Sequence, residues 1–395
     1  DLVRDVFGMG SQVARCWWEF SVEPHITRRL TLFVGGLLAM LALALMTLYL
    51  DPQKVLAHVA SADPRLVALA GLLYVFSWPL RGLRYRDILA EQGYHDTVGF
   101  LTGAVFVSQT GNLVFPARAG DAVRAYVMKT RRAVPYATGF ASLAVERVFD
   151  LLTITVLAGG VLVGLAAFAP DQVTALVTAL GGGGAVGSPE ADSGQFAVLV
   201  AGGVGACAVL AVAFIVLTAR TDRNLVRAVV SRASDDSYAD RVAAVVGRFA
   251  ADVQTVAGDP AAFGRVGLSS LLVWGIDVGT ALLVMLAFGV DLPLGQFLAV
   301  GFFAVSVGNL AKVLPLSPGG VGLYEGAFTL LVAALTPVSG PVALGAAIVD
   351  HAVKNVVTVL GGVASMLVLN LSLTRAVSGA EDAEADVSRP GAVDD

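Results

Sequence analysis

The stretch Phe106-Val-Ser-Gln-Thr-Gly-Asn112 returns as Phe303-Ala-Val-Ser-Val-Gly-Asn309, which lies 309 − 112 = 197 residues further along the chain. Both copies place a glycine and an asparagine inside an otherwise apolar region. The flanking sequence corresponds as well, because Trp78-Pro-Leu-Arg81 precedes the first copy and Trp274-Gly-Ile-Asp277 precedes the second. Duplicated halves that carry charges within apolar segments are typical of membrane transport proteins.

The composition indicates a polytopic membrane protein. Of the 395 residues, 56% are hydrophobic and 14% are charged, and the mean hydropathy is +0.77. Soluble domains usually have about a quarter of their residues charged. The net charge of −5 comes largely from residues 381–395, an acidic stretch with too little apolar content to fold. Cys16 and Cys207 lie in unrelated contexts and predict neither a disulfide framework nor a metal site.

Six segments are long and apolar enough to cross a bilayer, which takes about 20 residues for roughly 30 Å of hydrocarbon. They are Leu30 to Leu50, Leu66 to Leu83, Ala137 to Phe168, Phe196 to Leu217, Val266 to Val290 and Val342 to Leu371. Two further apolar regions, 98–128 and 294–335, hold the repeated signature and are broken near their centres by Asn, Pro and Gly. Each broken region is predicted to be a re-entrant hairpin or a pair of short crossing helices. The fold class is therefore predicted to be an all-α integral membrane protein.

Basic residues orient these segments, because Arg and Lys in short loops stay on the cytoplasmic side. Arg28 and Arg29 place the amino end inside, whereas the loop 169–195 contains no basic residue and is expected outside. Following the spans in turn, the first hairpin enters from the inside and the second from the outside. The sequence thus predicts an inverted-topology repeat with half-repeats of about 66–168 and 266–371.

The predicted organisation has three parts in a cell membrane, with both chain ends in the cytoplasm. Residues 1–29 form a cytoplasmic segment, 30–371 a transmembrane domain, and 372–395 a disordered acidic tail. A span and an amphipathic cytoplasmic helix at about 220–258 join the two half-repeats, since Val and Phe recur there at helical spacing opposite Arg and Asp.

Ionisable residues occur near the expected midplane of both halves. Glu146 lies ten residues after Tyr136, or about 15 Å along a helix, and Asp350 lies at a similar depth in the second half. A charge at such a depth costs at least about 2.5 to 3.5 kcal/mol, so these groups need partners or water. One interpretation is mutual neutralisation, by Arg147 with Asp150 and by Asp350 with Lys354. The other is a hydrated path for a charged lipid headgroup.

The excess of arginine in the first half favours a phosphate, which a guanidinium can bind through two hydrogen bonds. A new helix is expected to begin after the break in each of the broken regions, and the free backbone N–H groups of its first turn attract anions. The candidate path residues are Arg81, Asn112, Arg118, Asp121, Arg124, Glu146, Arg147, Asp150, Asp277, Asn309, Lys312, Glu325, Asp350, His351 and Lys354.

At these residues the chain resembles the lysylphosphatidylglycerol synthase transmembrane family, a group of flippase-like membrane proteins. The resemblance covers about residues 30–371, and the family usually has Glu where this chain has Asp121. It is carried by Arg81-Gly-Leu-Arg84, Gly111-Asn112 to Pro116, Arg118-Ala-Gly120-Asp121, Glu146-Arg147-Val-Phe-Asp150, and Pro315-Leu-Ser-Pro318-Gly319-Gly320-Val-Gly322 with Glu325. The resemblance implies translocation of a lipid between leaflets, or support of lipid-linked glycosylation.

The motif search favours a transporter over an enzyme. The sequence has no Walker loop, no dinucleotide-binding glycine motif, no Ser-His-Asp order and no histidine pair at ligand spacing. We therefore expect no cofactor, no metal and no nucleic-acid partner. The predicted function is translocation of an anionic lipid, such as a polyprenyl-phosphate sugar. The alternatives are a membrane partner that anchors a glycosyltransferase without moving lipid and, third, a membrane-embedded transferase with Glu146 or Asp350 as its base.

Overall fold

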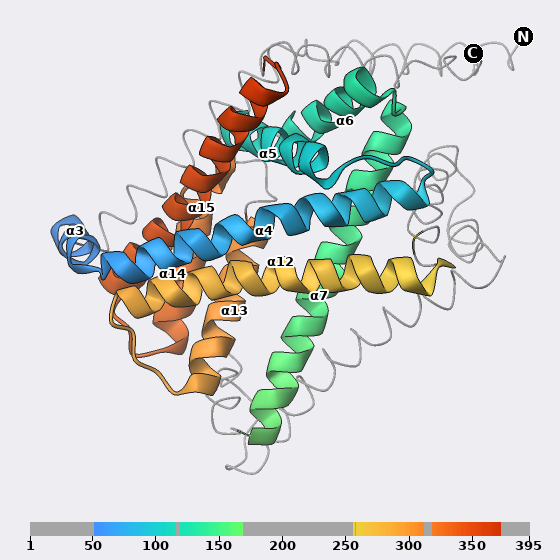
Figure 1. Ribbon diagram of the computed structural model, residues 1–395. Coiled ribbons are helices and arrows are strands. Elements are labelled where there is room, and N and C mark those ends of the chain that lie inside the picture. The colour runs from blue at the N-terminus through green and yellow to red at the C-terminus, as the bar shows by residue number, and fades with distance from the viewer. Residues whose placement is uncertain (1–50, 116–118, 169–255, 257, 312–317, 373–395) are drawn as a thin grey trace, which may run out of the picture.

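The computed structural model describes residues 51–115, 119–168, 256, 258–311 and 318–372, and these residues form helices and no strand (Figure 1). In chain order the elements are α3 (Pro52–Ser61), α4 (Pro64–Glu91), α5 (Val98–Val114), α6 (Ala119–Arg132), α7 (Tyr136–Phe168), α12 (Pro260–Ala287), α13 (Leu294–Ala311), the 3₁₀ turn η3 (Pro318–Gly320), α14 (Leu323–Leu335) and α15 (Gly340–Val368).

Three of the described helices, α4, α12 and α15, are long and apolar enough to cross a membrane. A fourth, α7, runs for 33 residues. These four cover the predicted spans that begin at Leu66, Ala137, Val266 and Val342. The other two predicted spans, residues 1–29, nearly all of the amphipathic helix at 220–258 and the acidic tail lie outside the described residues.

Helices α4 and α12 begin in the same way and lie side by side in opposite directions (Figure 1). Asp63 caps α4 by accepting a hydrogen bond from the Arg65 N–H at 2.8 Å, and Asp259 caps α12 through the Ala261 N–H at 2.8 Å. A proline follows each cap at the first helical position. The Asp63 N–H also donates to the Ala287 carbonyl at 2.9 Å, so the start of α4 meets the end of α12.

Each broken region folds back as a pair of short helices, which fits both forms that the sequence left open, a re-entrant hairpin and two short crossing helices. Helix α5 packs on α6, and α13 packs on α14. The first pair crosses closely at Gly120, where an added Cβ atom would lie 1.9 Å from the Ser108 carbonyl oxygen. The second pair crosses at Gly308, whose Cβ atom would lie 2.7 Å from the Tyr324 ring. Glycine is therefore required where the helices of each pair approach.

The two helix pairs pack against the long helices of opposite halves. Helix α5 contacts α15, and α13 contacts α7. Gly361 and Gly362 of α15 admit the side chains of Phe106 and Thr110, and the Thr110 hydroxyl donates to the Thr358 carbonyl at 3.1 Å. The first pair thus lies against the last span, which ties the amino-terminal half to the carboxyl-terminal half.

Large apolar side chains are exposed on the long helices. They include Leu72 and Phe76 on α4, Leu268 on α12, and Leu360 on α15. Contiguous exposed apolar surface is rare on soluble proteins but is required against lipid. The interior is apolar on both sides of the α4–α12 pair, with one core among α4, α5 and α6 and another among α12, α13, α14 and α15.

Candidate functional site

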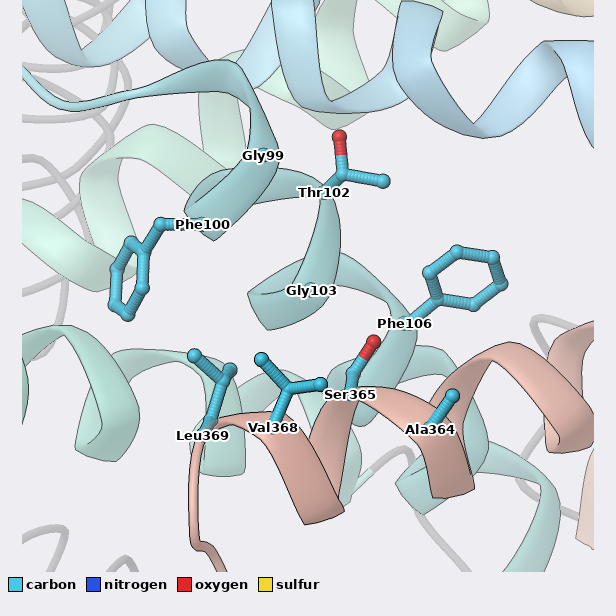
Figure 2. A pocket seen from close by; sticks show the side chains of 9 residues that line it. All are labelled: Gly99, Phe100, Thr102, Gly103, Phe106, Ala364, Ser365, Val368 and Leu369. Atoms are coloured by element: carbon cyan, nitrogen blue, oxygen red, sulfur yellow. The ribbon is translucent and has the colours of Figure 1, made fainter.

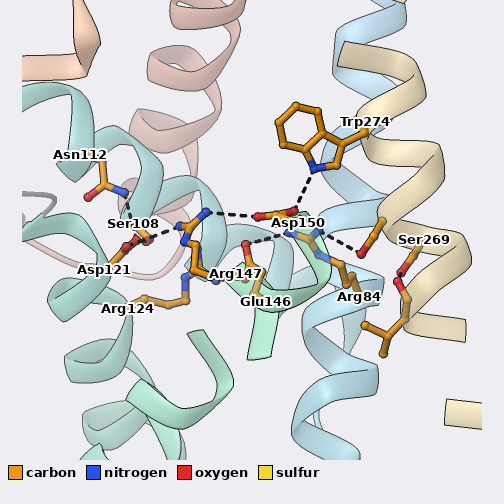
Figure 3. A network of polar contacts seen from close by, with 12 residues as sticks. Arg84, Ser108, Asn112, Asp121, Arg124, Glu146, Arg147, Asp150, Ser269 and Trp274 are labelled. Carbon is orange, nitrogen blue, oxygen red and sulfur yellow. Dashed lines mark hydrogen bonds and ion pairs between the residues drawn. The ribbon is translucent and has the colours of Figure 1, made fainter. Parts of the chain in front are cut away.

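Three arginines alternate with three carboxylates at the junction of α4, α6 and α7 (Figure 3). We call this set the arginine cluster; it consists of Arg84, Asp121, Arg124, Glu146, Arg147 and Asp150. Arg84 bridges two carboxylates of α7, at 2.8 Å from Glu146 Oε1 and 2.7 Å from Asp150 Oδ1. Arg124 binds the second oxygen of Glu146 at 2.6 Å. Glu146 is therefore held between guanidinium groups from two different helices.

The arginine cluster also has neutral donors and acceptors around it. Trp274 of α12 donates its indole N–H to Asp150 at 3.0 Å, and the Ser270 hydroxyl lies 3.2 Å from Arg84 Nη1. On the opposite side Asn112 donates its amide to Asp121 at 3.0 Å. Buried carboxylates need this kind of full hydrogen bonding to be tolerated in a low-dielectric interior. The cluster therefore involves five helices, α4, α5, α6, α7 and α12.

Exposure rises from one end of the arginine cluster to the other. The side chains of Arg84 and Arg124 are 1% and 0% exposed, whereas Arg147 is 34% exposed and Asp121 is 21% exposed. The ion pairs lengthen in the same direction, since Arg147 lies 3.3 Å from Asp150 and 3.5 Å from Asp121. The Arg84 end is a closed structural core, and the Arg147 end is accessible to a ligand.

A second set of charges lies among α12, α13, α14 and α15. We call it the lysine cluster; it consists of Asp277, Asn309, Tyr324, Glu325, Asp350, His351 and Lys354. Lys354 Nζ lies 2.9 Å from Asp350 and 3.3 Å from Asp277. Asn309 donates to Asp277 at 2.8 Å, and the Tyr324 hydroxyl donates to Asp350. All of these charged residues are buried, and Lys354 is 3% exposed.

Glu325 and His351 join the second helix pair to the last span. His351 Nδ1 lies 2.6 Å from Glu325 Oε1, and Glu325 Oε2 accepts the Gly322 backbone N–H at 2.7 Å. Gly322 has a φ of 85°, a left-handed conformation that favours glycine. Glu325 therefore both caps the start of α14 and contacts α15.

Arg81 has a different environment from the other arginines of the site. Its guanidinium lies 5.9 Å from the Tyr74 ring centroid and 5.6 Å from that of Trp78, both on the same helix. Within the part of the chain that the structure describes, it makes no ion pair, and its buried Nε has no hydrogen-bond partner. Arg84, one turn further along α4, is paired twice. Among the described residues, Arg81 is thus a cation without an anionic partner, and it lies within a membrane-spanning candidate.

The two clusters correspond at four positions. Each of four arginine-cluster residues precedes an ionisable residue of the lysine cluster by 204 positions (350 − 146 = 204): Asp121 and Glu325, Glu146 and Asp350, Arg147 and His351, and Asp150 and Lys354. The contact between Asp121 and Arg147 has its counterpart in the one between Glu325 and His351. The signs differ at one position, because the anion Asp150 is replaced by the cation Lys354. Four ionisable positions of the first cluster thus recur in the second at one spacing, with one reversal of sign.

The structure brings most of the predicted path residues into these two clusters. Arg118 and Lys312 lie outside the described residues, and Arg81 stands apart from both clusters. The clusters are neighbours along α12, because Trp274 contacts the first and Asp277, one turn later, belongs to the second. The two predicted local ion pairs, Arg147 with Asp150 and Asp350 with Lys354, are present.

Sequence reasoning did not predict the roles of three residues: Arg84 of the arginine cluster, Tyr324 of the lysine cluster, and Trp274 between them. Arg84 was named in the family motif Arg81-Gly-Leu-Arg84 but not among the candidate path residues, although its spacing of three from Arg81 places both on one face of α4. Trp274 and Tyr324 were not predicted to contact charges. A tryptophan in the repeated flank and a tyrosine next to Glu325 were the available signals. No group of His, Cys, Asp and Glu in the described residues has a metal-binding arrangement.

Comparison with known proteins gives a consistent family match. The model of the lysylphosphatidylglycerol synthase TM region matches residues 32–362. A protein named glycosyltransferase AglD from Haloferax volcanii is 62% identical over 379 residues, which is 95% of this chain. The match spans only 60% of that relative's length. A UPF0104 membrane protein from Methanothermobacter thermautotrophicus is 25% identical over 90% of this chain and 98% of its own length.

Proposed function

We propose, from the premise that this chain belongs to the lysylphosphatidylglycerol synthase transmembrane region family, that it binds an anionic membrane lipid and moves its headgroup between leaflets. The observation that carries the proposal is Arg81. A cation placed within a membrane span without an anionic partner is costly, and such residues generally serve a substrate or ion path. A lipid phosphate would supply the missing negative charge.

The electrostatic arrangement also supports a phosphate ligand. Arg84 and Arg124 both pair with Glu146 in the interior, so we assign them to positioning α4, α6 and α7 rather than to binding substrate. Arg147 keeps an exposed edge and makes longer contacts. Arginine binds phosphate through two parallel N–H groups. Arg81 and the exposed edge of Arg147 are therefore the proposed headgroup contacts.

An inverted repeat would suit this transport function. The antiparallel pairing of α4 with α12, the two helix pairs and the equivalent charges 204 residues apart support such a repeat. Transporters with inverted repeats place the substrate site at the interface of the two halves. The neighbouring clusters along α12 are at that interface. We propose a multi-pass protein of the cell membrane with both ends of the chain in the cytoplasm, acting without a cofactor and as a translocator rather than an enzyme.

The proposed substrate class is a lipid with a phosphate headgroup, and a polyprenyl-phosphate sugar is a specific candidate. The name of the relative from Haloferax volcanii, a glycosyltransferase, supports a link with glycosylation. The same observation favours a second candidate function. The chain would then be the membrane partner or anchor of a glycosyltransferase, holding its lipid substrate without moving it.

Reconstitution distinguishes these two functions. The purified chain is placed in liposomes, and leaflet exchange of fluorescent phosphatidylglycerol and phosphatidylcholine is measured against empty liposomes. The translocator is expected to accelerate exchange of the anionic lipid selectively. Wild-type protein that exchanges neither lipid, together with copurification of a glycosyltransferase from cells, would favour the anchoring function.

A further inference from the structure

An apolar groove follows the line along which the start of α5 packs on the end of α15 (Figure 2). Its volume is about 390 Å³. Gly99 and Gly103 of α5 present no side chain there, and Ser365, Val368 and Leu369 project from α15 toward α5. Thr102 and Ser365 contribute the only side-chain hydroxyls among the residues that line this groove, so the ligand that fits it is a hydrocarbon chain.

One end of the groove carries positive charge. Arg131 Nη2 donates to the carbonyl oxygens of Leu369 and Asn370 at 2.8 and 3.0 Å, which places it beside the groove residue Leu369. The Arg132 guanidinium lies 3.8 Å above the ring of Phe100, another groove residue, and pairs with Asp96. Both side chains are exposed, and the last turn of α6 also holds Lys129. The last turn of α6 thus holds three cations, and Asp96 pairs with one of them, Arg132.

The other end of the groove leads toward Arg81. Phe106 lines the groove there and stacks on Trp78 with 3.6 Å between ring centroids. The Trp78 ring also lies 5.6 Å from the Arg81 guanidinium. The groove therefore runs from an exposed basic end to the aromatic side chains that contact the unpaired arginine of α4.

We infer that this groove is the entry site of the anionic lipid, with one hydrocarbon chain lying between α5 and α15 and the phosphate at Arg131 and Arg132. The inference deepens the proposed function, because it names where the same lipid first binds. The combination of an apolar channel with exposed guanidinium groups at one end matches the two parts of a phospholipid. A zwitterionic headgroup such as phosphocholine also has a phosphate, but it brings its own ammonium cation to this basic end, where that cation is repelled by the guanidinium groups.

The test is photolabelling of the full chain in nanodiscs with a trace lipid that carries a diazirine on its acyl chain. Labelled phosphatidylglycerol is expected to crosslink to α5 and α15 peptides from the groove. Labelling by the phosphatidylcholine analogue is expected to be about tenfold weaker, since the choline cation offsets the phosphate charge and is repelled by Arg131 and Arg132. Equal labelling by the two lipids would overturn the inference.

Two matched variants separate loss of the groove from loss of folding. Gly99→Phe fills the groove from a position whose added Cβ atom meets nothing within 4 Å. Gly275→Phe adds the same ring at an exposed position of α12, where there is likewise nothing within 4 Å. Labelling should be lost in the first variant and kept in the second. Unchanged labelling in Gly99→Phe would contradict the site.

The outcome is independent of whether lipid is translocated. Leaflet exchange by wild-type protein without groove labelling would overturn the entry site and leave the proposed function standing. Selective groove labelling without exchange would confirm the lipid site and overturn translocation. Arg131→Gln is expected to reduce phosphatidylglycerol labelling while leaving the phosphatidylcholine signal unchanged, which tests the headgroup contact separately.

Discussion

Arg84 Nη2 lies 2.8 Å from Glu146 Oε1, so a cation of α4 holds a carboxylate of α7 in the interior of the protein. The two residues are 1% and 4% exposed. If one of the two side chains is removed, the charge of the other stays buried without water. The stability of such variants therefore measures how much the pair contributes to holding α4 against α7. The same guanidinium also binds Asp150 at 2.7 Å, so its loss affects two carboxylates.

Arg84→Ala is expected to destabilise the protein by about 3 to 5 kcal/mol, because it leaves Glu146 and Asp150 buried with fewer partners. The measurement is the free energy of unfolding in mixed micelles titrated with a denaturing detergent. The control is Arg265→Ala, which removes a half-exposed arginine 3.5 Å from Glu91. It should cost no more than about 1 kcal/mol. Equal effects of the two variants would show that the arginine cluster is not structural.

Lys354 and Asp350 should behave as a coupled pair. Lys354→Met leaves Asp277 and Asp350 without their shared cation, and Asp350→Asn removes the nearer carboxylate charge. The double variant is expected to lose less free energy of unfolding than the two single variants lose in sum, by at least about 1 kcal/mol. The same unfolding assay on all four proteins completes the cycle. Strict additivity would mean that the 2.9 Å contact contributes nothing.

Gly120→Ala should force the first helix pair apart. An added Cβ atom would lie 1.9 Å from the Ser108 carbonyl oxygen and 2.5 Å from the Asn112 nitrogen, which are backbone atoms that cannot rotate away. The expected cost is at least about 1 to 3 kcal/mol. Gly99→Ala, on the same helix pair but in open space, is the control and should change stability little. Wild-type stability of Gly120→Ala would contradict the close crossing of α5 and α6.

The inverted repeat predicts opposite sides for equivalent loops. His95 precedes α5 and Asp291 precedes α13, and these exposed positions are 291 − 95 = 196 residues apart. With Cys16 and Cys207 replaced by Ser, His95→Cys should react with a membrane-impermeant maleimide only in inside-out vesicles. Asp291→Cys should react only in intact cells. Reaction of both from one side would rule out the inversion.

Much of the helical framework could be predicted from hydropathy and breakers. The segments 98–128 and 294–335 fold as helix pairs because glycine, asparagine and proline interrupt otherwise continuous apolar sequence. The ion pairs of Arg147 with Asp150 and of Asp350 with Lys354 were also predictable, because a spacing of three or four residues places both groups on one helix face.

Contacts between helices could not be predicted in this way. The predicted second span ends at Leu83, where the apolar run stops; α4 continues to Glu91, and in this last part Arg84 pairs with Glu146 and Asp150 of α7. Arg84 and Glu146 are 62 positions apart, and no local pattern joins them. That Arg81 has no ion pair among the described residues could not be predicted for the same reason, since it depends on which carboxylates the fold brings near.

Arg81 has no anionic partner among the described residues, and we propose that it binds the lipid phosphate. Charge-selective leaflet exchange tests this most directly. In liposomes, Arg81→Gln is expected to slow exchange of phosphatidylglycerol about tenfold, the effect of losing one charge-assisted contact. Arg265→Gln, which removes an arginine that pairs with Glu91, is expected to keep the wild-type rate. If Arg81→Gln exchanges phosphatidylglycerol as fast as the wild-type protein, Arg81 does not bind the headgroup and the account is contradicted.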